Sequence, residues 1–264
     1  MLPVLAALLV AQPAYAKAQL VAEVSTVQPG VPFLAAVVID TEPEWHVYWK
    51  NPGDSGMPTS IEWKLPAGWK ADPLEFPTPK SFVSGGIVGY GYEGEAMFLA
   101  RITPPKDAKT APLKADVRWL VCKEACLPGS ANVAVSLPVG PAKASATWAS
   151  RLKEAESKVP RAAKDWSFKA AETKDGYELT ALVPAGVVVK GEPEFLPFDS
   201  TVAAHDAPQK VNLGEGKITL AFRKSPYATA KPKTLKGLLV APLGKRWPNG
   251  LDAIVVEAPI ASGG

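Results

Sequence analysis

The sequence predicts an all-β protein, and three observations support this fold class. The 264 residues include 27 prolines and 21 glycines, which are spread along the whole chain and interrupt any long helical pattern. Between these breaks lie short runs rich in Val, Ile, Thr, Trp and Tyr, which favour strands. Hydrophobic residues make up 47% of the chain, enough to fill the core of one large or two ordinary domains.

The N-terminus predicts export. An apolar stretch, Met1 to Val10, is followed by Ala14-Tyr15-Ala16, which has the small-residue pattern of a cleavage site. We interpret residues 1–16 as a signal peptide cleaved after Ala16. No basic residue precedes Lys17, so a start upstream of Met1 is an alternative. A buried helix or anchor is another, although about ten apolar residues are too few to span a bilayer. An exported protein meets oxidising conditions, in which two cysteines can form a disulfide.

Residues 17–140 predict a first β domain. Turns such as Gln28-Pro29-Gly30 separate its strand-like runs. In the run that ends at Cys122, residues 117, 119 and 121 share one face, and residues 118, 120 and 122 share the other. The runs lie at residues 19–24, 33–39, 45–49, 60–65, 95–103, 117–122 and 132–137.

Residues 141–160 predict a helical connector. Apolar residues at positions 148, 152, 155 and 159 recur at helical spacing, with Ser145 as the expected N-cap and Pro160 as the end. Beyond it the alternation typical of strands returns, for example at residues 177–183 and 218–222. We therefore expect a second β-sandwich domain, without cysteine, over residues 161–264.

Composition argues against several functions. The 29 basic and 26 acidic residues nearly cancel, and the basic residues form no block that could neutralise a run of phosphates. We therefore expect no nucleic-acid partner. The sequence contains no G-x-S-x-G, phosphate-binding loop or H-E-x-x-H motif, so it gives no support to a hydrolase, a nucleotide enzyme or a zinc protease.

The two cysteines, Cys122 and Cys126, are the strongest chemical feature. A disulfide needs Cα atoms within about 7 Å, whereas four extended steps of chain span roughly 13 Å. The segment must therefore fold back, and Pro128-Gly129 favours a turn in a hairpin. A loop this short contributes only about 2 kcal/mol in the loop-entropy model. Reversible exchange, in contrast, benefits from a second thiol that resolves a mixed disulfide. The spacing favours redox function and leaves a structural disulfide or metal ligation open.

Two alternatives belong to other functional classes. His46, Met57 and Met97 are, with the cysteines, soft ligands suited to Cu(I), so a copper-handling protein is one alternative. No M-x-x-M or H-x-H cluster supports it. The other is a redox-inert β-sandwich binding module with a structural disulfide, which the redox potential of the pair would distinguish.

Four segments of the first domain, one of which contains both cysteines, resemble a known family. Together they are similar to the periplasmic N-terminal domain of the DsbD/ScsB family of thiol:disulfide interchange proteins, closely over residues 20–140 and more loosely beyond, where the ScsB type is the better match. The resemblance implies an immunoglobulin-like β-sandwich in the periplasm and a link to cytochrome c biogenesis. The segments are Trp45 to Gly56, Phe76 to Pro79, Gly89 to Glu95 and Trp119 to Pro128.

The resemblance also implies roles for the two cysteines. They would cycle between dithiol and disulfide, with Cys126 attacking the substrate disulfide and Cys122 resolving it. Electrons would come from a thioredoxin-like donor or a membrane reductase and pass to oxidised exported proteins. Family members usually continue into membrane and thioredoxin-like domains, which these 264 residues do not contain. We therefore expect a donor supplied in trans, unless the sequence is a fragment, and we expect no cofactor and no metal site.

Three active-site neighbours follow from the same resemblance. His46 and Tyr48 match the aromatic positions beside the disulfide of the family, and Phe82 lies where a cap loop is expected. Tyr90 is a further candidate to line the active edge, although aromatic alternation on a strand is usually core or cross-strand packing. Two features depart from the best-known DsbD domain: the spacing between the cysteines is shorter, and its acidic cap has no clear counterpart. The glycines that follow Phe82 indicate mobility more than a fixed acid.

Overall fold

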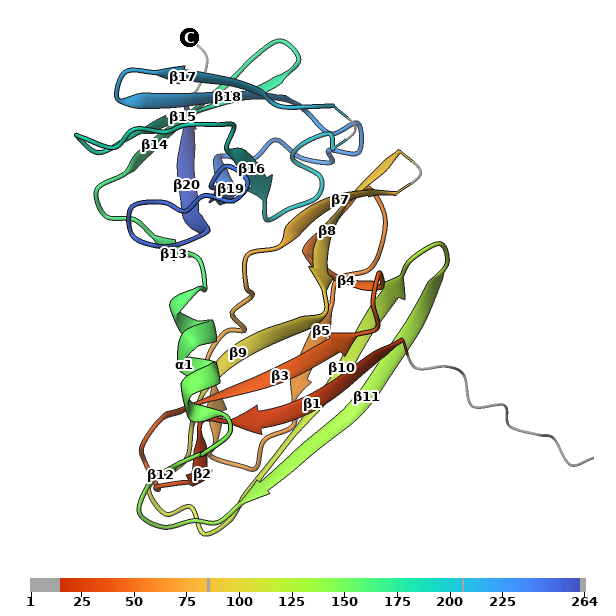
Figure 1. Cartoon of the computed structure of the whole chain (residues 1–264), viewed down its shortest axis with the longest axis vertical. Helices are drawn as coiled ribbons and strands as arrows, with labels where there is room; N and C mark the ends of the chain where they lie inside the picture. Colours follow the sequence, from red (N-terminus) through yellow and green to blue (C-terminus); the bar gives the residue numbers. More distant parts are fainter. Residues whose placement is uncertain (1–14, 85, 206, 262–264) are drawn as a thin grey trace, which may run out of the picture.

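The computed structural model describes residues 15–84, 86–205 and 207–261. These form two β domains joined by the helix α1 (Ala149–Ser157), which runs along one side of the molecule (Figure 1). The first domain comprises β1 (Ala16–Ala22), β2 (Val24–Thr26), β3 (Phe33–Thr41), β4 (His46–Gly53), β5 (Ser60–Trp63), β6 (Lys70–Ala71), β7 (Lys80–Ser84), β8 (Ile87–Glu93), β9 (Glu95–Thr103), β10 (Ala111–Cys122), β11 (Cys126–Leu137) and β12 (Lys143–Ala144). The second comprises β13 (Arg161–Ala162), β14 (Ser167–Glu172), β15 (Gly176–Leu182), β16 (Glu194–Pro197), β17 (Lys210–Gly214), β18 (Lys217–Arg223), β19 (Thr234–Val240) and β20 (Ala253–Ala261).

The first domain is a sandwich of two antiparallel sheets. One sheet has the order β1-β3-β9-β6, and the other has the order β11-β10-β4-β8-β7, with β5 paired to β10. Inward-facing residues from both sheets, among them Val37, Trp49, Phe98 and Trp119, form one buried core. The predicted all-β fold with an immunoglobulin-like sandwich is confirmed.

The hairpin of β10 and β11 is the longest element of the domain. Its register runs without interruption from Ala111 opposite Leu137 to Cys122 opposite Cys126. The runs expected at residues 117–122 and 132–137 are therefore parts of two longer strands. Because the hairpin closes just beyond the last pair, both cysteines lie at its tip.

Strand β4 extends further than the sequence suggested. The expected run ended at residue 49, but Asn51 to Gly53 continue β4, and Gly53 pairs with Gly89 after an irregularity in the register. Asn51 is only 1% exposed. Its Nδ2 donates a hydrogen bond to the carbonyl oxygen of Pro197, 2.8 Å away, and its Oδ1 accepts one from the Gly53 amide. A partner 146 residues away thus replaces the local turn.

Helix α1 covers the outer face of the four-stranded sheet. Leu152 is fully buried there, in a cluster with Val38 and Leu99. The helix begins later than expected, because its N-cap is Trp148. Ser145 instead accepts a hydrogen bond from the Trp148 amide in the preceding turn. In the part of the chain that the structure describes, no helix is long and apolar enough to cross a membrane.

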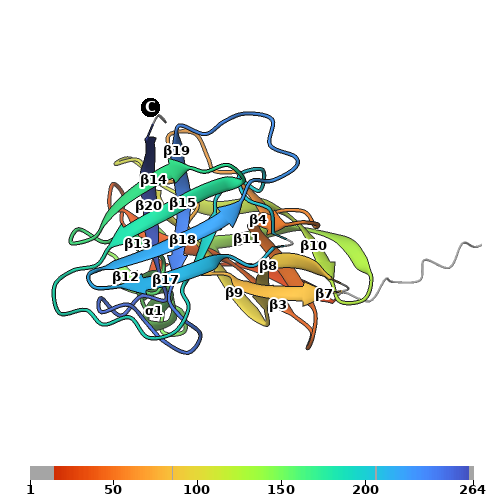
Figure 2. The same ribbon diagram turned by 90° about the horizontal axis from the view of Figure 1, so that it is seen from above.

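The second domain is one curled sheet with the order β16-β19-β20-β14-β15-β18-β17. Its two halves meet where β14 pairs with the end of β20, and Figure 2 shows β14, β15, β18 and β17 crossing over β19 and β20. Leu179, Phe195, Leu220 and Ile254 fill the space between the halves. Leu196 at the base of this domain packs into the core of the first one, so the two domains share a packed interface.

Most of the predicted signal peptide, residues 1–14, lies outside the described residues. Tyr15 stacks on Trp45 with ring centroids 3.8 Å apart, and Ala16 begins β1 opposite Thr41. Cleavage after Ala16 would therefore remove a residue that pairs in the sandwich. The cleavage position stays a prediction.

Candidate functional site

The cysteine pair forms a disulfide at the tip of the β10–β11 hairpin. Its Cα atoms are 4.2 Å apart. The three-residue connection, Lys123 to Ala125, folds back on itself, and the Lys123 amide donates a hydrogen bond to the Ala125 carbonyl oxygen at 3.2 Å. The turn that the spacing and Pro128-Gly129 indicated is therefore present.

The two cysteines are not equally exposed. Cys122 is 2% exposed and lies opposite His46 of β4 in the sheet, whereas Cys126 is exposed on the outermost strand. A partner that approaches from solvent therefore meets Cys126 first.

Tyr48 and His46 lie next to the cysteines, and Phe82 packs against both of these side chains. Tyr48 Oη is 4.0 Å from Sγ of Cys126 and 3.4 Å from Nε2 of His46. The ring of Phe82, from β7, lies with its centroid 4.0 Å from that of His46 and 5.9 Å from that of Tyr48. The structure thus brings together the two cysteines and three of their four expected neighbours.

Strand alternation and two glycines explain this arrangement. Val47 and Trp49 of β4 face the core, so His46 and Tyr48 face outward, on the side of Cys122. Gly56 has a φ of 111°, and a Cβ there would lie 2.5 Å from the Tyr48 ring. A Cβ on Gly89 would lie 2.3 Å from the ring of Phe82. Both rings thus occupy space that any other residue would fill.

Burial sets the charge state of the two polar neighbours. It lowers the pKa of His46, against the opposing influence of Glu93, so this imidazole is neutral at pH 7. It also raises the pKa of Tyr48, although a hydrogen bond from Ser55 opposes it, so the phenol keeps its proton. Because a disulfide sulfur carries no proton, the Tyr48 hydroxyl is the donor toward Cys126.

The structure places Tyr90 elsewhere. It belongs to the core of the first domain, and its hydroxyl lies 3.0 Å from Nδ1 of His205 in the second domain. It therefore faces the domain interface instead of the active edge that we expected. His205 and a second contact residue, Glu194, were not singled out from the sequence, because nothing in their local pattern indicates a partner over 100 residues away.

The soft ligands of the copper alternative do not gather in one place. Met97 packs against helix α1 on the four-stranded sheet, whereas the cysteines lie on the other sheet. Met57 lies in the loop after β4 and is 41% exposed. Among the described residues, no three His, Cys, Asp or Glu side chains form a group suited to a metal ion. Copper handling therefore gains no support from the geometry.

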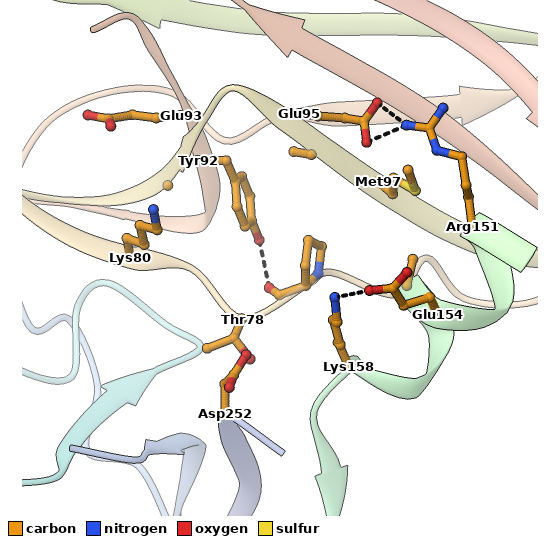
Figure 3. Close-up of a pocket in the computed structure, with 14 residues that line it drawn as sticks. Thr78, Lys80, Tyr92, Glu93, Glu95, Met97, Arg151, Glu154, Lys158 and Asp252 are labelled. Atoms are coloured by element: carbon orange, nitrogen blue, oxygen red, sulfur yellow. Dashed lines mark hydrogen bonds and ion pairs between the residues drawn. The ribbon is translucent and has the colours of Figure 1, made fainter. Parts of the chain in front are cut away.

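A charged cleft of about 480 Å³ lies between β8, β9, helix α1 and the start of β20 (Figure 3). Arg151 pairs with Glu95, and Lys158 pairs with Glu154. Tyr92 donates a hydrogen bond to the Pro77 carbonyl oxygen at its wall. Opposite charges satisfy one another here, and neither cysteine lines the cleft.

Fold and site together define an immunoglobulin-like domain with a short-range disulfide between a buried and an exposed cysteine. Residues 14–138 match the family model described as the N-terminal domain of the thiol:disulfide interchange protein DsbD. The first domain of this chain is therefore similar to the DsbD N-terminal family over these residues. No curated protein matches the chain significantly.

Among solved structures, the chain is similar to the N-terminal periplasmic domain of ScsB from Proteus mirabilis. The TM-score is 0.70 at 16% identity, over 96% of this chain and 97% of that one. This likeness covers both domains and shows a shared fold. Two structures of the major pilin SpaD from Corynebacterium diphtheriae match with TM-scores of 0.27 and 0.28 at 11% and 13% identity, over 91% of this chain and 59% and 88% of those chains. Scores this low carry no argument.

Proposed function

We propose that this protein carries out thiol-disulfide exchange in the periplasm through Cys122 and Cys126. The observation that carries the proposal is the unequal exposure of the two cysteines at a hairpin tip, in a domain that matches the DsbD N-terminal family model. An inert disulfide gains nothing from one accessible sulfur, whereas exchange requires it.

Reduction of the pair begins at Cys126. A thiolate of a thioredoxin-like donor attacks Sγ of Cys126, and the Cys122 thiolate leaves. A second donor thiolate then attacks the donor sulfur in this mixed disulfide and releases Cys126. The donor becomes a disulfide, and the pair gains two electrons and, with two protons from solvent, becomes a dithiol.

The forward step uses the same exposed sulfur. The Cys126 thiolate attacks a disulfide of an oxidised exported protein, and one substrate thiolate leaves. Cys122 then attacks Sγ of Cys126, which re-forms the pair and releases the second substrate thiol. Tyr48 keeps its proton at neutral pH and lies beside this sulfur, so it can donate a hydrogen bond to the thiolate.

Trapping of covalent complexes tests the proposal. In cells that express the natural partners, Cys122→Ser removes the thiol that resolves a mixed disulfide on Cys126. Partners should therefore accumulate on Cys126 as a reducible species of higher mass. Cys126→Ser should trap fewer, because Cys122 is buried. The double variant, which cannot form a mixed disulfide, is the matched control.

Two outcomes would count against the proposal in different ways. Equal trapping by both single variants would reverse the assignment of roles and leave exchange in place. No trapping by either would favour the redox-inert binding module, and a potential below about −300 mV, typical of structural disulfides, would support that reading.

A further inference from the structure

The strand that carries Phe82 is tied to the second domain. Alternate residues of a strand face opposite sides, so Ser81 points away from the face on which Phe82 covers His46. The Ser81 hydroxyl donates a hydrogen bond to Oε2 of Glu194, at the start of β16, with 2.8 Å between the oxygens. The β7–β8 hairpin lies on the side of the first domain that faces the second domain (Figure 1). The residue directly before Phe82 thus contacts the other domain.

The second strand of the hairpin has its own contact. Tyr90 lies directly opposite Ser81 in the β7–β8 register, and its hydroxyl is 3.0 Å from Nδ1 of His205. Nε2 of His205 lies 3.3 Å from the carbonyl oxygen of Ser200 and donates a hydrogen bond to it, so in the neutral imidazole Nδ1 accepts a hydrogen bond from the Tyr90 hydroxyl. Both strands are therefore held at a single cross-strand pair, directly before the pair of Phe82 and Gly89.

Strand β4 ends on the same part of the second domain. Beyond His46 and Tyr48, Asn51 bonds the Pro197 carbonyl oxygen at the end of β16. The Lys50 ammonium lies 3.2 Å from the ring centroid of Phe198, which follows. Strand β7, which carries Phe82, and strand β4, which carries His46 and Tyr48, are thus both held by contacts with β16 or with the residue after it.

We propose that the second domain is a brace that positions Phe82 over His46 and Tyr48, the neighbours of the disulfide. Through Glu194 and His205 it holds the β7–β8 hairpin so that Phe82 stays over His46 and Tyr48 and limits access to the cysteine pair. Ser81, Glu194 and His205 are positioning residues in this scheme, because they act through Phe82. The inference rests on the proposed exchange function and adds a role for the second domain.

The rate at which dithiothreitol reduces the pair measures this access. Dithiothreitol supplies two electrons, leaves as its cyclic disulfide and needs no partner protein. Loss of one hydrogen bond of ordinary net strength changes an opening equilibrium about fivefold. Ser81→Ala and Glu194→Ala should therefore be reduced about fivefold faster than the wild type, as followed by quenched thiol labelling. Glu194→Gln keeps an oxygen that can accept the Ser81 hydrogen bond, so it should restore the wild-type rate.

Phe82 provides the decisive comparison. Phe82→Ala should be reduced at least as fast as Glu194→Ala, and the double variant should be no faster than Phe82→Ala, because both changes remove the same cover. Glu75→Ala is the matched control, since it breaks the Arg161–Glu75 ion pair between the domains away from this hairpin. It should keep the wild-type rate.

Three results would overturn the brace. They are wild-type rates in both Ser81→Ala and Glu194→Ala, multiplicative effects in the double variant, and equal acceleration in Glu75→Ala. All rates are measured at a temperature well below the unfolding midpoint of each variant. Ser81→Ala removes a single exposed hydroxyl, so it should fold and keeps the proposal testable if another variant does not. The assay needs no partner, so a failure of exchange in the trapping experiment and a failure of the brace are separate results.

Discussion

At His46 of β4 and Cys122 of β10, both faces of the strands are buried, but by different means. Val47 and Val121 on the inner face pack against the opposite sheet. His46 and Cys122 on the outer face are as poorly exposed, at 6% and 2%, yet Phe82 from a hairpin is what packs over His46. The comparison teaches that this domain keeps its cysteine pair beside the face that an aromatic ring covers, and not on the face that a second sheet covers.

The largest expected effect is on the inner face. Trp119 is 4% exposed in the core, so Trp119→Ala should lower the free energy of unfolding by about 3–5 kcal/mol. Leu120 is the matched control, because it is the next residue of β10 and faces outward, and Leu120→Ala should cost about 1 kcal/mol. Urea denaturation measures both values. Equal losses would mean that the two faces do not differ as described.

The next effect separates the disulfide from the fold. Replacement of both cysteines by Ser should lower the free energy of unfolding by about 2 kcal/mol, because the closed loop is short. Reduced wild type should unfold at the same urea concentration as this variant. Exchange with a thioredoxin-like donor should be lost. If the double variant cannot fold, the disulfide is structural, and the claim that the fold does not depend on it is refuted.

A smaller effect concerns the hydroxyl beside Cys126. Tyr48→Phe removes a hydrogen bond to the reduced sulfur and should leave less thiolate at pH 7. Reaction of Cys126 with a small disulfide probe, in a Cys122→Ser background, should slow about fivefold. At a pH at which all of the thiol is ionised, the variant and its parent should react at similar rates. An unchanged rate at pH 7 would remove Tyr48 from the chemistry.

The smallest effect is a pH dependence from His46. Burial lowers its pKa below the ordinary value of 6.5, so the unfolded chain binds this proton at a higher pH than the folded one. Its contribution to stability is therefore complete above pH 6.5 and is lost as the pH falls from there toward the folded-state pKa. His46→Gln should reduce the stability lost between pH 7.5 and pH 5, as measured by urea denaturation. An identical loss in both proteins would contradict this assignment.

Local patterns were enough to predict much of the first domain and of its site. The alternation at residues 117–122 predicted which side of β10 carries Cys122, and the three-residue spacing predicted the hairpin turn. The expected positions of His46, Tyr48 and Phe82 came from the family resemblance, and the structure gathers these three beside the pair. Side-chain alternation and turn formation depend on neighbours within a few residues, and such neighbours are visible in a sequence.

Long-range partners decided the rest. Asn51 continues a strand instead of entering a loop because a carbonyl oxygen of the second domain accepts its hydrogen bond. Tyr90 faces the core and His205 instead of the active edge. Ser145 was expected to cap helix α1 but lies in the turn before it. In the first two cases the sequence alone could not indicate the partner.

The sequence by itself determined the fold class, the cysteine hairpin and the chemistry that two nearby thiols permit, because each of these depends on composition and short spacing. Only the tertiary structure decided that Cys126 is exposed while Cys122 is not, and that Glu194 and His205 reach the hairpin carrying Phe82. Exposure and contacts between domains depend on how distant segments pack. No local pattern encodes which residue, 113 or 115 positions along the chain, will complete a hydrogen bond.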